Sequence, residues 1–285
     1  MTTEIHPPTT EATPDLRLFE RFRNSDAARM LRDRIPATGE TLQLRRVFGS
    51  LKGLLLAELF RQQNRQLIVI APDSATAQEL WNDLSLLLGD PQVLYIGERY
   101  SHTQKQIRNI TSTFAENADA LRSLTESPIR VVVTDIRTTF REFPSVQEIR
   151  EQSLRITCGQ HVEQLHLIRR LAYGGFEQTE FVTSTGEYAL RGGIVDIYPV
   201  GFDNPLRVEF FGDDIESIRE FDALSQRSIR PLEEAAFVTS LFLDDESRAQ
   251  SRMPEFFDSQ ALLFIDGWEE VQQCAEEQGH RDVLD

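Results

Sequence analysis

Apolar and polar residues alternate between helix-like and strand-like patterns over the first half of the chain. Residues 45–63 carry apolar positions at helical spacing, and residues 66–72 form a continuous apolar run typical of a strand covered on both faces. The pattern also predicts helices over 75–89, capped by Asp73 or Ser74, and through Phe114 and Leu121, and strands over 92–97 and 129–135. Strands that alternate with helices predict parallel βαβ units.

The pattern changes near Ser153 and changes back near residue 261. A strand over 154–159 and a helix over 161–176, ending at a Gly-Gly cap, precede several short strands separated by turn residues. These strands are expected over 179–190, 192–200, 206–211 and 215–222. They predict an antiparallel meander with one helix. Beyond the meander, a buried strand over 261–266 and a helix over 267–278 return to the alternation of strands and helices seen in the first half.

We therefore predict an α/β domain with a parallel sheet, interrupted by a smaller α+β domain. The expected division is a flexible tail over 1–15, domain 1A over 16–152, domain 2 over 153–236 and domain 1B over 237–285. Domain 1B completes domain 1 and ends early, so we expect the chain to be a fragment of a longer protein.

Composition and charge narrow the class of protein. The 285 residues carry a net charge of −16, with 40% hydrophobic and 27% charged residues, which is typical of a globular protein and argues against direct DNA binding. Cys158 and Cys274 lie far apart, so we expect neither a disulfide framework nor a zinc site. The sequence has no membrane-spanning run and no signal-peptide pattern, which favours the cytoplasm.

One stretch resembles a phosphate-binding loop that has lost its essential residues. Gly49, Ser50 and Lys52 precede an apolar helix, but aligning Lys52 with the lysine of a P-loop places leucine at the second glycine and glycine at the Ser/Thr. The backbone cradle and the magnesium ligand would then both be missing. We interpret this stretch as a degenerate nucleotide loop, with Lys52 a solvated helix residue.

No other pattern predicts catalysis. The five histidines lack metal-ligand spacing, and acidic pairs such as Asp213 and Asp214 are typical of solvated turns. The sequence therefore predicts no catalytic residues, no metal site, no cofactor and no enzymatic activity.

Two strands carry residues suited to an interface. In 206–211, alternation places Leu206, Val208 and Phe210 on a core face and Arg207, Glu209 and Phe211 on the other. Exposed aromatic residues and arginines are enriched at binding hot spots. The alternative is that Arg207 pairs with a carboxylate such as Glu209 and that Phe211 packs under a loop.

A third candidate, Arg191, stands beside two glycines inside a strand-like stretch, GEYALRGGIVDIYPVG. Strand interiors usually avoid glycine, so Gly192 and Gly193 predict a bulge or a close approach of two backbones. Such a kink would point Arg191 outward near Arg207 while Val195 and Ile197 continue into the core. The alternative is a structural bulge with a solvated arginine.

The block TGEYALRGGIVDIYPVGFDNPLRVEFFGDDIESIREFD, followed by SQRS, resembles the UvrB-homology module at the N-terminus of bacterial transcription-repair coupling factors (Mfd). The resemblance extends more weakly over about residues 44–266. It implies that domain 1 is a degenerate, helicase-like α/β fold, because such modules lack the intact P-loop of UvrB. It also implies that domain 2 contacts UvrA, the damage-recognition protein, through the positions of Arg191, Arg207 and Phe211.

The resemblance implies a non-catalytic adaptor that recruits UvrA in transcription-coupled nucleotide excision repair. Its other partners would be the motor and RNA-polymerase-binding modules of the same factor, where any ATP-driven translocation would lie. Two alternatives stay open at this point: a UvrB-like ATP-dependent repair enzyme, and a purely structural domain.

Overall fold

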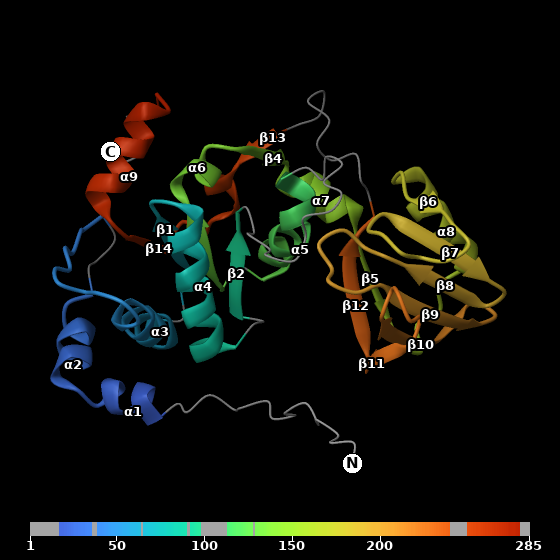
Figure 1. Ribbon diagram of the computed structural model, residues 1–285, viewed down its shortest axis with the longest axis horizontal. Helices are drawn as coiled ribbons and strands as arrows, with labels where there is room; N and C mark the ends of the chain where they lie inside the picture. The colour runs from blue at the N-terminus through green and yellow to red at the C-terminus, as the bar shows by residue number, and fades with distance from the viewer. Residues whose placement is uncertain are drawn as a thin grey trace, which may run out of the picture.

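A computed structural model describes residues 17–35, 39–63, 65–89, 92–97, 113–127, 129–239 and 250–279. The predicted tail over 1–15 lies outside the described residues. Figure 1 shows a helix-covered sheet and, beside it, a second unit built mainly of strands. The helices are α1 (Arg17–Arg23), α2 (Asp26–Arg32), α3 (Leu51–Gln63), α4 (Ser74–Leu88), α5 (Thr113–Glu126), α6 (Ile136–Thr139), α7 (Val146–Gln152), α8 (Gln164–Tyr173) and α9 (Trp268–Glu277), with a short 3₁₀ turn, η2 (Met253–Phe256).

The first sheet is parallel and takes its strands from both ends of the chain. Its order is β14 (Leu262–Ile265), β1 (Leu67–Ala71), β3 (Val131–Asp135) and β2 (Val93–Ile96). The chain thus leaves this sheet after β3 and returns to it at β14, on the far side of β1. The predicted α/β fold interrupted by a smaller unit is confirmed.

Both faces of the parallel sheet are covered, as the apolar runs predict. On β1, Leu67 and Val69 pack with α3 and α4, whereas Ile68 and Ile70 pack on the opposite side with α5 and α9. The side chain of Asp73 caps α4 by accepting a hydrogen bond from the backbone N–H of Thr76, at 2.8 Å. Helices therefore cover both faces of the parallel sheet, as expected for βαβ units.

The second unit is a six-stranded sheet. Its strands run in the order β11 (Ser228–Leu232), β10 (Asp214–Phe221), β9 (Leu206–Phe211), β8 (Ile194–Ile197), β7 (Glu187–Arg191) and β6 (Glu177–Gln178). Neighbours from β7 to β11 are antiparallel, which confirms the meander, and β6 pairs with β7 in parallel. Helix α8 packs on one face, with Leu167 and Leu171 fully buried in the same core as Val195 and Val208.

Two small sheets lie between these units. Strand β5 (Ser153–Thr157) pairs with β12 (Glu234–Val238), and β4 (Glu142–Pro144) pairs with β13 (Gln250–Arg252), both antiparallel. The segments that enter and leave the smaller unit are therefore held side by side. The domain boundary expected at residue 236 falls inside β12.

Two element boundaries and one expectation of burial differ from the prediction, each for a local reason. Helix α3 begins at Leu51 rather than Arg45, because Arg46 and Gly49 adopt left-handed backbone angles that no helix contains. Residues 179–186 are a loop, in which the Glu187 side chain accepts hydrogen bonds from the backbone N–H groups of Thr183 and Ser184. Strand β14 is an edge strand, and its Leu263 is 58% exposed rather than buried.

Candidate functional site: the outward face of the meander

The Gly192–Gly193 pair forms a tight turn between β7 and β8. Arg191 pairs with Ile194, so the two glycines are the whole loop, and Gly192 adopts a φ of +62°. Glycine is favoured at the first central position of two-residue hairpins for this reason. The structure thus shows a hairpin where the sequence suggested a bulge.

Gly193 fits because the neighbouring strand passes very close. A Cβ on Gly193 would lie 2.6 Å from the carbonyl oxygen of Phe210, and the backbone N–H of Phe210 donates to the carbonyl of Gly193 at 2.7 Å. The predicted close approach of backbones is therefore present. It brings the ends of β7, β8 and β9 together, and Val195 and Ile197 enter the core as expected.

Strand β9 presents its residues as alternation predicts. Leu206, Val208 and Phe210 are buried, whereas Arg207 and Glu209 are partly exposed and Phe211 is 79% exposed. The phenylalanine does not pack under a loop. The outward face of the meander, meaning the side of β7 to β10 that carries Arg191, Arg207 and Phe211, is thus charged at its centre and apolar at one end.

At the centre of this face lies a residue that sequence reasoning missed, Asp196 on β8. Its side chain is fully buried and accepts hydrogen bonds from Arg207 Nε at 2.7 Å and Arg207 Nη2 at 2.9 Å. Arg191 also donates to it through Nη2. Register explains the cluster: Asp196 stands directly opposite Arg207 on β9 and opposite Ala189 on β7, two residues from Arg191.

The structure thus decides two of the alternatives left open by the sequence: Arg207 pairs with a carboxylate, as one alternative held, and Arg191 is not solvated. Arg207 pairs with Asp196 and not with Glu209, whose carboxylate instead accepts hydrogen bonds from Arg219 at 2.5 Å and Ser217 at 2.8 Å. Arg191 is not a free, solvated arginine, because it shares Asp196. The strand pattern contained a signal for this cluster, since Asp196 is an acidic residue between Val195 and Ile197 on the face that carries arginines.

Aromatic rings support both guanidinium groups. The Arg207 guanidinium lies 4.5 Å from the centre of the buried Phe221 ring, and that of Arg191 lies 5.5 Å from the Phe181 ring. Gln226 accepts a long hydrogen bond from Arg207 Nη2 at 3.5 Å. The hydrogen bond to Asp196 raises the pKa of Arg207, so its charge persists at every physiological pH.

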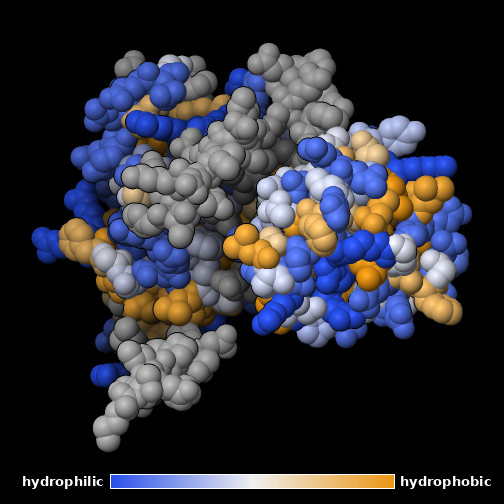
Figure 2. Space-filling view, turned by 45° about the vertical axis from the view of Figure 1, so that its right-hand side comes forward, coloured by the Kyte–Doolittle hydropathy of each residue, from blue (hydrophilic) through white to orange (hydrophobic). Residues whose placement is uncertain are grey.

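Figure 2 shows separate apolar patches among hydrophilic residues on the side of the meander unit that is turned to the viewer. Exposed large apolar residues of this unit include Phe181, Phe211, Leu224 and Ile229. Aromatic residues and arginines, surrounded by a polar surface, are typical of protein-binding sites.

The degenerate nucleotide loop has a different geometry from the one expected. Lys52, in the first turn of α3, donates to Asp266 at 2.7 Å, and only 24% of the Lys52 side chain and 10% of the Asp266 side chain are exposed. Lys52 is therefore an ion-paired residue rather than a solvated one. Gly49 sits just before the helix, and the backbone N–H of Lys52 donates to its carbonyl at 3.1 Å.

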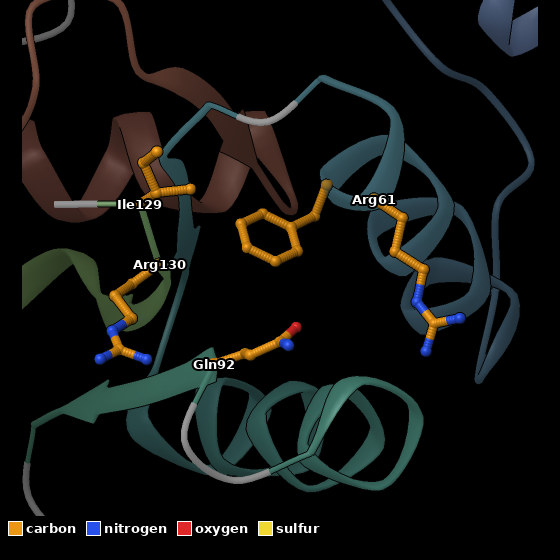
Figure 3. A pocket seen from close by; sticks show the side chains of 5 residues that line it. Arg61, Gln92, Ile129 and Arg130 are labelled. Carbon is orange, nitrogen blue, oxygen red and sulfur yellow. The ribbon is translucent and has the colours of Figure 1, made fainter. Parts of the chain in front are cut away.

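A cavity of about 370 Å³ lies at the other end of the parallel sheet, lined by Phe60, Arg61, Gln92, Ile129 and Arg130 (Figure 3). Gln92 and Arg130 immediately precede β2 and β3, whereas ligands of such sheets bind beyond the carboxyl ends of the strands. Arg61 is engaged by the fold, because it donates to the carbonyl of Leu87 at 2.9 Å and lies 4.9 Å from the Phe19 ring. The lining brings together no acid–base pair.

The described residues contain no helix long and apolar enough to cross a membrane. Within the same residues, no cluster of three or more histidine, cysteine, aspartate or glutamate side chains is placed to hold a metal ion.

Comparison with known proteins agrees with this geometry. Residues 154–240 match the UvrB interaction domain, a range that contains the whole meander and α8. The chain is 30% identical over 190 residues to the transcription-repair-coupling factor of Bacillus subtilis, covering 65% of this chain and 16% of that protein. It is 29% identical over 222 residues to that of Myxococcus xanthus, covering 75% and 18%, and 27% identical over 198 residues to one from Staphylococcus aureus, covering 67% and 16%.

The smaller unit of the chain is therefore similar to the UvrB interaction domain. The chain is similar, over most of its length, to one stretch of the transcription-repair-coupling factors, which confirms the resemblance described from the sequence. The matched region spans 16 to 18% of the length of these relatives.

Proposed function

We propose that this chain is the adaptor part of a transcription-repair coupling factor, and that it recruits UvrA through the outward face of the meander. The observation that carries the proposal is the convergence of Arg191 and Arg207 on Asp196, beside the exposed Phe211, inside the matched interaction domain. Its relatives are named for the coupling of transcription to repair. We therefore expect this chain to bring UvrA to stalled polymerases.

The chemistry of this face suits a protein partner. Arginine offers a planar set of donors that binds carboxylates, and an exposed phenylalanine gains free energy when a partner removes it from water. In the chain as a whole the charge is −16, so the cationic centre of this face is a local feature rather than part of a basic surface. That combination favours a protein partner over the phosphate backbone of DNA.

The rival function, an ATP-dependent enzyme of the UvrB type, has less support. A lysine that binds β- and γ-phosphates must be free to approach them, whereas Lys52 is held by Asp266. We therefore propose that the loop before α3 has a structural role, and that any motor of the full-length factor lies outside this chain.

The test is calorimetric titration of purified UvrA with the parent chain and with Arg191→Ala, Arg207→Ala and Phe211→Ala. Each substitution is expected to weaken binding by about 2 kcal/mol or more, roughly thirtyfold, because hot-spot residues carry most of the energy of an interface. Circular dichroism and thermal melting establish that each variant is folded.

Two control variants keep the residue type and change the location. Arg230→Ala removes an exposed arginine of β11 that lies on the opposite side of the sheet, paired with Glu220, and Tyr173→Ala removes an aromatic side chain that is 85% exposed on α8. Both are expected to bind like the parent. Absence of binding by the folded parent would refute the adaptor proposal, whereas equal binding by all three site variants would refute only the site.

A further inference from the structure

The carboxylate of Asp196 uses both its oxygens within the fold. Oδ1 accepts from Arg207 Nε, and Oδ2 accepts from Arg207 Nη2 and from Arg191. Asp196 is completely buried, whereas the side chains of Arg207 and Arg191 are 16% and 35% exposed. A buried carboxylate is tolerated only when it is paired, so Asp196 strongly favours the arrangement in which both arginines stand over it.

This arrangement leaves one part of each guanidinium group facing outward. Arg207 donates to Asp196 through Nε and Nη2, and its Nη1 donates to no residue in the described part of the chain. Arg191 donates to Asp196 through Nη2 alone, and its Nη1 and Nε donate to no described residue. The stacking of these groups near Phe221 and Phe181 limits their rotation further.

The charges at this site do not cancel. Two guanidinium groups share one carboxylate. Two other acids of the same face are engaged elsewhere: Glu209 accepts from Arg219 and Ser217, and Glu187 accepts from the backbone N–H groups of Thr183 and Ser184. The cluster of Asp196, Arg191 and Arg207 therefore carries one net positive charge, with the exposed Phe181 ring beside Arg191. The group that complements two outward N–H edges and one net positive charge is a carboxylate.

We infer that Asp196 is a positioning residue, which holds Arg191 and Arg207 as one preorganised receptor for a single acidic side chain of the partner. The inference rests on the proposed function, because UvrA is the partner. It adds that the partner residue bound by the two arginines is a glutamate or aspartate. It also adds that Asp196, which does not contact the partner, determines the affinity. Preorganisation matters because two long, flexible side chains would otherwise lose conformational freedom on binding.

The first test is Asp196→Asn, which keeps the shape of the side chain and removes its charge. Both arginines remain, so a surface that acted through its net positive charge alone would bind UvrA at least as tightly as the parent. The inference predicts the opposite, a loss of at least tenfold in affinity by calorimetry. Affinity within twofold of the parent would overturn the inference and leave the adaptor proposal intact.

A second measurement separates positioning from general structural damage. In a ¹⁵N–¹H spectrum, the Arg207 Nε–H signal of the parent should exchange slowly with water, because that proton is bonded to a buried acceptor. In Asp196→Asn it should exchange at least tenfold faster, while backbone amide signals of the parallel sheet stay unchanged. An unchanged Arg207 signal would contradict the positioning role.

A third variant covers the case in which Asp196→Asn does not fold. Arg207→Lys keeps the positive charge but cannot make the two-point contact with Asp196. It should lose affinity about as much as Arg207→Ala, and parent-like binding would overturn the inference. If the parent itself fails to bind UvrA, the proposed function fails, and the arginine exchange measurement still decides whether Asp196 holds the guanidinium groups.

Discussion

At the scale of single residues, the site depends on side chains that meet across neighbouring strands of the meander. Arg207 and Asp196 are eleven positions apart and Arg191 and Asp196 only five, yet the hairpin register decides which of them meet. Alternation along β9 predicted correctly which residues face outward. It could not predict that Arg207 would choose Asp196 over Glu209, because that choice depends on how β8 and β9 are aligned.

His161 provides a test of residue-scale electrostatics on the same unit. Its Nδ1 lies 2.8 Å from Oδ1 of Asp214, and this hydrogen bond raises the pKa of His161 above the ordinary value of 6.5. A raised pKa means that the contact stabilises the fold at pH values below 6.5, and that this contribution is lost as the pH rises through the folded pKa.

We expect NMR titration of the His161 ring to give a pKa above 6.5 in the parent and a lower pKa in Asp214→Asn. A His161 titration that is the same in parent and variant would contradict the pairing.

At the scale of elements, most helices and strands follow from periodicity, and the failures have identifiable causes. The run 66–72 became a buried strand and Asp73 capped α4 as predicted. The start of α3 was wrong by six residues, because apolar spacing carries no information on the left-handed backbone of Arg46 and Gly49. Residues 179–186 looked like a strand, but they form a loop in which the Glu187 carboxylate accepts hydrogen bonds from the backbone N–H groups of Thr183 and Ser184.

The pair of Lys52 and Asp266 joins two elements that are more than two hundred residues apart in sequence. It connects the first turn of α3 to the end of the edge strand β14. We expect Asp266→Asn to lower the free energy of unfolding by on the order of 2 kcal/mol, between the effects typical of exposed and buried ion pairs. Chemical denaturation measures the change.

The control is an exposed ion pair of the same chain. Glu234→Gln removes a carboxylate that pairs with Arg155 across β5 and β12, where both side chains are about half exposed. It should cost less than about 1 kcal/mol. If Asp266→Asn cost no more than this control, the pair would not hold α3 to β14, and the structural role proposed for the loop before α3 would lose its support.

At the scale of the whole molecule, the two units are joined by packing as well as by chain connections. One continuous core contains Ile68 and Val132 of the parallel sheet and Val195 and Val208 of the meander. Arg170 of α8 donates to the carbonyls of Glu151 and Ser153, at 3.0 and 3.4 Å, where the chain enters the smaller unit. The sequence predicted the interruption of the first sheet, but it carried no signal for this shared core.

Two loops of the smaller unit cover part of the outward face: Val182 packs with the buried Ala189 and Phe221, and Gln226 donates to the carbonyl of Val182 at 3.1 Å. Helix α8 packs on the opposite face of the sheet. Beside these loops, Phe211 is 79% exposed and the side chains of Arg191 and Arg207 are 35% and 16% exposed, so a partner can reach all three. We therefore propose that the partner approaches the molecule from the side of Arg191, Arg207 and Phe211.

The most direct test places a photo-crosslinking amino acid at position 211 of the chain and irradiates it with UvrA. We expect a covalent product with UvrA from position 211. We expect none from position 173, which is at least as exposed but lies on α8 across the sheet. Crosslinking from 173 and not from 211 would contradict the central claim that the outward face of the meander binds UvrA.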